Sequence, residues 1–274
     1  MSVFSRRTVV YMILVAVLVL MLSPFGWLAI TALKDASELR ALPIHWWPHE
    51  PTLGNFEQAL TLFDYLGYAR NSLTIATLYA VLVTLASAWA GYGFARLEAP
   101  GKKAVFGVLL STMMLPGVIT LIPTYLMFAK LHLVNTYMPW VLWGLSGAPY
   151  LIFLFRQFFT NMPKELEEAA IVDGCGQVRI FWRIFLPQSW PVMATSFILS
   201  FSWTWGDYIA PALLLDDART TLAVKLAIGY TNEHGAQLSN LVAAGAVMYV
   251  VPVLVLFLIM QRGFISGIST SGLK

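Results

Sequence analysis

Few residues in this sequence have the types and spacing that catalysis requires. The four histidines lie at positions 45, 49, 132 and 234. Pro48 excludes the regular helix that would bring His45 and His49 together as metal ligands. Gly101-Lys102-Lys103 lacks the upstream glycine and the Ser or Thr of a phosphate-binding loop. We therefore expect no catalytic residues, no metal site and no cofactor bound by this chain, so that any chemistry must come from a partner.

One charged segment, residues 163–187, has a distinctive spacing and lies between two apolar stretches. It begins with Pro163 and a run of acidic residues, which is typical of a helix start because negative side chains favour the positive end of a helix. Gly174 permits a turn that redirects the chain.

The first half of this segment has the character of a docking helix. Ala169 and Ala170 carry so little side chain that another protein could approach closely, and Glu168 could pair with a basic residue of that protein. An ordinary amphipathic surface helix is the alternative. These features point to Glu168, Ala169, Ala170 and the turn at Gly174 as the docking region.

The composition places these elements in a lipid bilayer. Hydrophobic residues make up 58% of the chain and charged residues only 11%, with a mean hydropathy of +0.72, whereas about a quarter of residues are charged in soluble domains. The single cysteine, Cys175, excludes an internal disulfide, and a net charge of +3 is too small to indicate nucleic acid. We expect a membrane protein with lipids as partners and no nucleic-acid partner.

Six apolar stretches are long enough to cross a bilayer, which needs roughly 20 helical residues. The sequence therefore predicts an all-α polytopic protein with six transmembrane helices, the first of them not cleaved as a signal peptide. Bends are expected at Pro116, Pro123 and Pro211. The predicted spans are Val9–Leu33, Leu73–Ala95, Ala104–Ala129, Met138–Phe159, Trp190–Leu215 and Leu241–Met260.

The distribution of Lys and Arg gives the orientation of these spans. With the N-terminus inside, eleven Lys and Arg residues fall in inner segments and six in outer ones. Both termini and residues 163–187 are thus predicted to be cytoplasmic. The two longer outer loops, about 34–72 and 216–240, hold eight of the 14 acidic residues. They are either solvated loops or a docking surface for a partner outside the membrane.

The spacing within residues 163–187 resembles the EAA signature of bacterial ATP-binding-cassette (ABC) importer permeases. Glu168-Ala169-Ala170 is followed after three residues by Gly174, then after nine residues by Ile184 and by Leu186-Pro187. Other residues, spread over about 52–274, are similar to the carbohydrate branch, and residues 261–274 are similar to MalG-like permeases. Gly206 departs from that pattern, where Asn is usual, and Cys175 stands where Ala is usual. The other matching residues are Asn71-Ser72, Arg96, Gly101-Lys102, Leu115-Pro116, Ile122-Pro123, Leu131, Asn135-Thr136, Trp205 and Asp207-Tyr208.

The resemblance implies a type I ABC importer permease (MetI-like) fold. Residues 1–71 would hold the first helix and an outer loop, residues 72–264 the transmembrane domain with the coupling segment 163–187, and residues 265–274 a cytoplasmic tail. Such a permease is not an enzyme. The resemblance implies that coupling to its ATPases is carried by Glu165, Glu168, Ala169, Ala170, Asp173, Gly174, Ile184 and Pro187. In the bacterial inner membrane such a permease would act with a MalF-like second permease, two ATPase subunits that bind ATP and Mg, and an extracytoplasmic solute-binding protein that delivers a sugar.

Two further sets of residues are predicted with open alternatives. The tail would contact the ATPases through Gly267, Ser271 and Gly272, unless it is only a frayed chain end. A translocation path is predicted to include Tyr125, Trp143, Trp205 and Asp207. The three aromatic residues could stack on a sugar ring but are more often packing residues, and Asp207 could equally make a helix-packing or gating hydrogen bond.

Other classes of transporter remain as alternatives. A permease of the same kind could carry a non-sugar solute such as glycerol phosphate, an amino acid or a peptide. A secondary carrier would also be polytopic, but it would normally show inverted repeats or pairs of broken helices. A membrane-embedded enzyme would need His, Asp or Glu converging near one face, which the positions of the histidines do not provide.

The predicted orientation can be tested by labelling intact cells with a membrane-impermeant thiol reagent. The reagent should fail to reach Gln177→Cys and should reach Thr61→Cys or Gln237→Cys, because only the latter two positions are predicted to lie outside. Labelling of Gln177→Cys from outside would overturn the orientation.

Overall fold

A computed structural model describes the backbone of residues 3–231, 235 and 237–269, and the side chains of residues 7–231, 235 and 237–261. These residues form helices joined by turns and loops. Among them no strand occurs, and Thr231 and Gln237 make an isolated bridge. The prediction of an all-α protein is therefore confirmed.

The apolar spans overlap the predicted ones, although two of them consist of bent helix pairs. Four are long apolar helices, and two more consist of bent helix pairs, so that six spans result if each bent pair counts as one. The four are formed by α1 (Val3–Ala32), α3 (Tyr65–Arg96), α6 (Met138–Ser146) with α7 (Pro149–Thr160), and α14 (Ser239–Ser269). The bent pairs join α4 (Lys102–Thr112) to α5 (Gly117–Lys130) and residues 177–188 to α11 (Trp190–Gly206).

Of the three prolines at which the sequence predicts bends, Pro116 lies at a break between two helices, whereas Pro123 and Pro211 lie inside helices. The third predicted span turns by 98° between α4 and α5, because Pro116 has no N–H to continue a helix and lies in extended backbone. Pro123 lies inside α5 without ending it. The fifth span ends at Gly206, and the short helix α12 (Ile209–Leu214), with Pro211 inside, follows separately. Asp207 therefore lies beyond the span and not within it.

The chain divides into two compact units, of which unit 1 comprises Met1–Gly67 and Lys225–Pro252. It includes α1, the 3-10 turn η1 (Glu38–Arg40) and α2 (Gly54–Thr61), and α13 (Leu222–Ile228) begins just before its second segment. Buried Asn55 donates hydrogen bonds to the carbonyl oxygens of Ala32 and Lys34, both at 2.8 Å. The side chain of Asn240 in turn donates to Asn55 Oδ1 at 2.8 Å. These bonds satisfy the chain where it leaves the first span.

The loop between η1 and α2 brings two of the histidines, His45 and His49, close together. The rings of His45 and His49 lie 4.5 Å apart in an edge-to-face arrangement. Residues 45–49 form no helix, as Pro48 predicts, and it is the irregular loop that brings the two rings together. Within the described residues, no group of three His, Cys, Asp or Glu side chains that could hold a metal ion is found.

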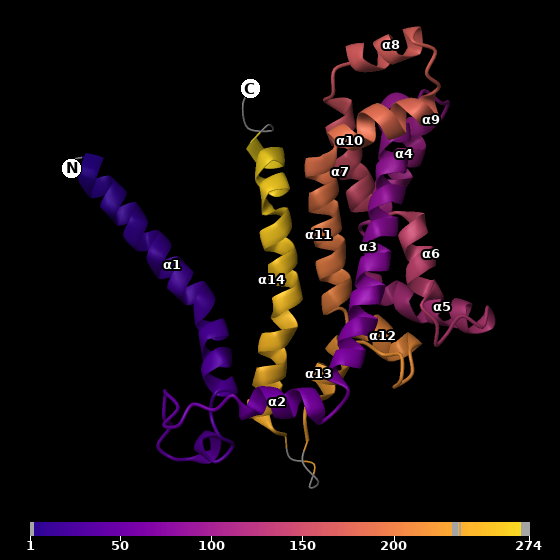
Figure 1. Cartoon of the computed structure of the whole chain (residues 1–274). Helices are drawn as coiled ribbons and strands as arrows, with labels where there is room; N and C mark the ends of the chain where they lie inside the picture. The colour runs from indigo at the N-terminus through magenta and orange to yellow at the C-terminus, as the bar shows by residue number, and fades with distance from the viewer. Residues whose placement is uncertain (1–2, 232–234, 236, 270–274) are drawn as a thin grey trace. The chain divides into compact units, whose positions relative to one another are not determined.

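Unit 2 comprises Tyr68–Val224 and Val253–Lys274. Figure 1 shows α8 (Glu165–Val172) at one end of this unit, and α12 toward its opposite end. Each of these two ends contains a cluster of buried hydrophobic side chains. The cluster near α8 includes Tyr92, Phe159, Phe181 and Phe185. The cluster near α12 includes Ile75, Phe128, Trp140 and Leu214.

Polar side chains fasten the loop that follows α12. Asn135 adopts a left-handed backbone with φ of 61°, which Asn tolerates better than most residues. Its N–H donates to the carbonyl oxygen of Leu214 at 2.7 Å, and its side chain donates to Asp216 at 2.5 Å. Asn71 donates to the carbonyl oxygen of Thr220 at 3.1 Å. Two residues that carry the family resemblance, Asn71 and Asn135, thus hold one loop.

A close helix contact in unit 2 lies between α3 and α7. A Cβ atom at Gly91 would lie 2.6 Å from Phe155 Cβ and 3.0 Å from the backbone nitrogen of Arg156. Membrane helices lack a hydrophobic driving force for association, so small residues that allow close approach are important for their packing.

Gly91→Ala is therefore expected to destabilise the protein by about 1–3 kcal/mol, since the backbone of α7 must shift. Gly93→Ala is the matched control, because a Cβ there meets nothing within 4 Å. Thermal unfolding of both purified variants in detergent measures the effect. Equal melting temperatures for the two variants would contradict the close contact.

Candidate functional site

Helix α8 forms where the sequence predicts it, directly after Pro163. The backbone N–H groups of Glu167 and Glu168 donate to the carbonyl oxygen of Lys164 at 2.9 and 3.0 Å. Glu165, Glu168 and Ala169 are exposed, whereas Ala170 is only 6% exposed and packs on the aromatic cluster beneath. The small side chain of Ala170 thus lets α8 pack closely against its own chain. The exposed surface of α8 includes the other three residues together with Leu166, Ile171 and Val172.

The end of α8 is closed by a Schellman motif centred on Gly174. The N–H of Gly174 donates to Ile171 O and the N–H of Cys175 donates to Ala170 O, both at 2.9 Å. Gly174 has φ of 76°, a left-handed conformation that costs glycine nothing. Cys175, half-buried, packs against the same cluster as Ala170. The predicted turn at Gly174 is therefore confirmed.

The chain then returns toward α11 through three short helical pieces. These are α9 (Gln177–Ile180), a π-helical turn η2 (Phe181–Phe185) and α10 (Leu186–Gln188). Ile184 is half-buried and Pro187 is exposed. Val178 and Trp182 are 59% and 50% exposed, which leaves apolar surface uncovered beside α8. A surface hollow is lined in part by Gly174, Trp182 and Arg183.

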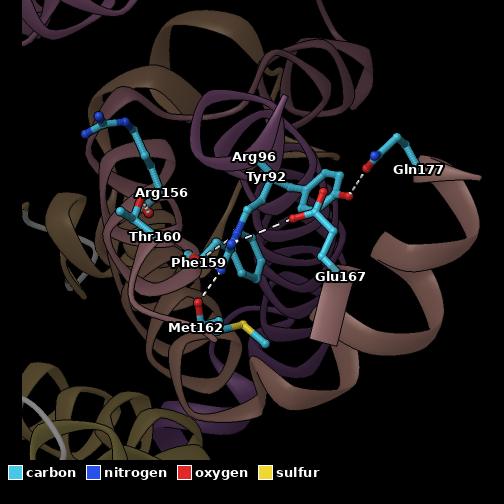
Figure 2. A network of polar contacts seen from close by, with 8 residues as sticks. All are labelled: Tyr92, Arg96, Arg156, Phe159, Thr160, Met162, Glu167 and Gln177. Carbon is cyan, nitrogen blue, oxygen red and sulfur yellow. Dashed lines mark hydrogen bonds and ion pairs between the residues drawn. The ribbon is translucent and has the colours of Figure 1, made fainter. Parts of the chain in front are cut away.

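Arg96, at the end of α3, joins this site to the rest of unit 2. Its Nε and Nη2 atoms donate to the carbonyl oxygen of Phe159 at 3.1 and 2.7 Å, and Nη2 also donates to that of Met162. Its Nη1 atom lies 3.7 Å from a carboxylate oxygen of Glu167 on α8. Figure 2 shows the guanidinium between the end of α7 and this carboxylate.

Two more contacts support the same corner. The guanidinium carbon of Arg96 lies 5.0 Å from the centre of the Phe185 ring, within range of a cation–π contact. The hydroxyl of Tyr92, one turn earlier on α3, donates to Gln177 Oε1 at 2.5 Å. Figure 2 draws this bond on the other side of Glu167. Arg96 and Tyr92 together connect α3 to α7, α8, α9 and η2.

Sequence reasoning missed Glu167, Tyr92 and Gln177 as site residues, and took Arg96 only as part of a resemblance. The signal for Arg96 was present, since a cation at the end of an apolar span often binds helix-end carbonyls. Glu167 stands in the same acidic run as Glu165 and Glu168. Only the direction of its side chain, which is 14% exposed, separates it from them.

The residues predicted for a translocation path lie apart from α8. Tyr125 and Trp143 are half-buried in the cluster near α12, where Trp143 lies 5.4 Å from the Phe128 ring. Trp205 is 2% exposed, and its ring is stacked on Phe201.

Asp207 acts as a cap for α12. Its Oδ1 atom accepts the N–H groups of Ile209 and Ala210 at 2.9 and 3.3 Å, which are donors that the helix itself leaves unsatisfied. Of the predicted tail residues, Gly267 lies within α14, which continues to Ser269. Ser271 and Gly272 lie outside the described residues.

The geometry of the α8 site fits binding and transmission of movement. The exposed face offers acidic, small and apolar side chains to a partner, while the inner face is tied to α3 and α7 through a buried cation. Chemistry on a bound group would need convergent nucleophiles, bases or metal ligands. The described contacts of α8 are instead caps, packing and one ion pair.

Gly174→Ala is expected to weaken the end of α8 by about 1–2 kcal/mol, because alanine is strained in the left-handed conformation. Hydrogen exchange at the amides of residues 174 and 175 should then speed up roughly 5- to 30-fold. Gly176→Ala is the control, since Gly176 has φ of −77° and open space at its Cβ position. Unchanged exchange in Gly174→Ala would refute the capping role.

Comparison with known proteins gives the chain a family. A family model described as "binding-protein-dependent transport system inner membrane component" matches residues 83–265. YurM of Bacillus subtilis, a probable ABC transporter permease protein, is 32% identical over 99% of this chain and 90% of its own length. The melibiose/raffinose/stachyose import permease MelC of the same species is 34% identical over 92% of this chain and 91% of its own.

A solved structure supports the same assignment at the level of fold. A chain of a bacterial ABC transporter involved in the import of the acidic polysaccharide alginate matches with a TM-score of 0.83 and 19% identity, over 96% of this chain and 98% of that one. The predicted permease fold is therefore confirmed, and the apolar helices make the chain a multi-pass membrane protein. The chain belongs to the binding-protein-dependent transport system inner membrane component family, the permease components of ABC importers.

Proposed function

We propose that this permease imports a sugar, and that α8 is the helix through which an ATPase drives the transport. The observation that carries the proposal is the two-sided construction of α8. Its exposed face presents Glu165, Glu168 and Ala169, and its inner face is fixed to the membrane helices through Arg96. A helix with such a free outer face, fastened inward by a buried ion pair, suits a mechanical contact.

The proposed assembly follows from the family. A second permease of MalF-like type would complete the translocation path, two ATPase subunits would bind ATP and Mg, and an extracytoplasmic binding protein would deliver the solute. Both termini and α8 would face the cytoplasm of a bacterial cell, as the distribution of Lys and Arg predicts. ATP would bias the permease between inward-facing and outward-facing states.

The sugar class rests on the names of relatives and on the sequence resemblance to the carbohydrate branch. MelC is named for melibiose, raffinose and stachyose, and the permease AraQ of Halalkalibacterium halodurans, 34% identical over 83% of this chain, is named for arabinooligosaccharides. Tyr125, Trp143 and Trp205 are proposed to contribute to the path only where the second permease or a conformational change exposes them. Gly267, Ser271 and Gly272 are proposed to approach the ATPases.

Uptake into proteoliposomes tests this function. The complex, purified with the partners encoded beside it, would be given melibiose, raffinose, lactose and arabinotriose as radiolabelled probes, with ATP supplied on the ATPase side of the vesicles. ATP-dependent accumulation of at least one sugar is expected. Accumulation of an amino acid, a peptide or glycerol phosphate in place of every sugar would favour the alternative solute classes.

Glu168→Lys tests the role of the exposed face. We expect normal abundance in the membrane, because the Glu168 side chain is exposed on α8, together with loss of uptake and weaker ATPase binding. Removing one partner of a desolvated charge pair typically costs about 2–5 kcal/mol, and the reversed charge would in addition repel a basic partner residue. Glu98→Lys, an equal charge change at an exposed loop residue, is the control. Wild-type uptake by Glu168→Lys would refute the docking role.

A further inference from the structure

Arg96 and Glu167 are charged residues whose position the docking surface does not explain. Their side chains are only 6% and 14% exposed, so a partner on the outer face of α8 would scarcely touch either of them. A partly buried ion pair is also weak evidence for a purely stabilising role, since the cost of removing both charges from water offsets much of their attraction. The pair therefore needs another explanation.

The contacts of Arg96 differ in rigidity. Toward α7 the guanidinium makes short hydrogen bonds to the carbonyl oxygen of Phe159, in the last turn of α7, and to that of Met162, two residues beyond its end. Toward α8 the nearest atoms of the pair are 3.7 Å apart, too far for a short hydrogen bond. The α7 side is a fixed anchor, whereas the α8 side is an electrostatic attraction that persists over a range of distances.

We propose that Arg96 and Glu167 are a positioning pair that transmits displacement of α8 to α3 and α7 during transport. This inference rests on the proposed function. The ion pair keeps α8 attached to Arg96 while α8 moves. The hydrogen bonds from Arg96 to the carbonyl oxygens of Phe159 and Met162 then transmit the displacement to the end of α7. Tyr92 adds a second attachment, because its bond to Gln177 ties α3 to the segment that follows Gly174.

The identity of Arg96 follows from this role. A planar guanidinium can donate to two carbonyls, face a carboxylate and stack on the Phe185 ring at the same time. A lysine ammonium carries the same charge as a single point without the planar fork. Arg96→Lys should therefore keep the positive charge but lose the simultaneous contacts with the two carbonyl oxygens, the carboxylate and the Phe185 ring.

The test measures the number of sugar molecules accumulated per ATP hydrolysed in the reconstituted complex. The probe is melibiose, or whichever of raffinose, lactose and arabinotriose the wild-type complex carries. Glu167→Gln keeps the shape of the side chain and removes its charge. We expect this variant and Arg96→Lys to assemble with unchanged subunit stoichiometry and to lower the ratio at least about fivefold, the lower end of ordinary coupling between sites.

Glu98→Gln is the control, since it makes the same chemical change at an exposed residue two positions after Arg96. A pair that only stabilises the fold would lower uptake and hydrolysis together, in proportion to the assembled complex, and would leave the ratio unchanged. That result in Glu167→Gln would overturn the inference even if Arg96→Lys failed to fold. A wild-type complex that carries no sugar would overturn the proposed function, and this inference with it.

Discussion

The unsatisfied carbonyl groups at the end of α7 impose a constraint on which much of unit 2 depends. A helix leaves its last four carbonyl oxygens without partners, and near a membrane they cannot all rely on water. The guanidinium of Arg96 bonds one of them, that of Phe159, together with the carbonyl oxygen of Met162 just beyond the helix. Because Arg96 belongs to α3, the donor also fixes where α3 ends, and because its charge is almost fully buried, it draws Glu167 inward. The orientation of α8 follows from that attraction.

Local features of this arrangement could be predicted from the sequence. Pro163, the acidic run and Gly174 mark the start and end of α8, since each acts on backbone conformation within a few residues. The face of α8 could not be predicted in the same way. Glu167 and Glu168 are adjacent and chemically identical, and only the position of Arg96, about 70 residues earlier in the sequence, decides which one turns inward. Ala169 and Ala170 are likewise adjacent and identical, and only the aromatic cluster beneath α8 decides that Ala170 is the buried one.

For the apolar spans too, the sequence predicts some features and not others. Composition locates the four long apolar helices and the two bent pairs, because hydropathy is a property of the segment alone. It does not fix how Pro116 bends the third span by 98°, or that the fifth ends before Asp207. Aromatic residues are harder still. Trp143 packs against Phe128 and Trp205 against Phe201, and a ring suited to a sugar is equally suited to another ring, so sequence alone could not separate the two uses.

The first helix illustrates how weakly a segment is constrained when it buries little surface within its own chain. None of the most apolar stretch of α1 is buried. At such positions any apolar side chain of any shape satisfies the bilayer, so selection acts on average hydropathy and hardly on individual residues. Gly91 on α3 is under the opposite pressure, since one added methyl group would strike α7. Among descendants of this gene, the apolar stretch of α1 is therefore free to diversify in sequence, while position 91 of α3 is held to glycine by its contact with α7.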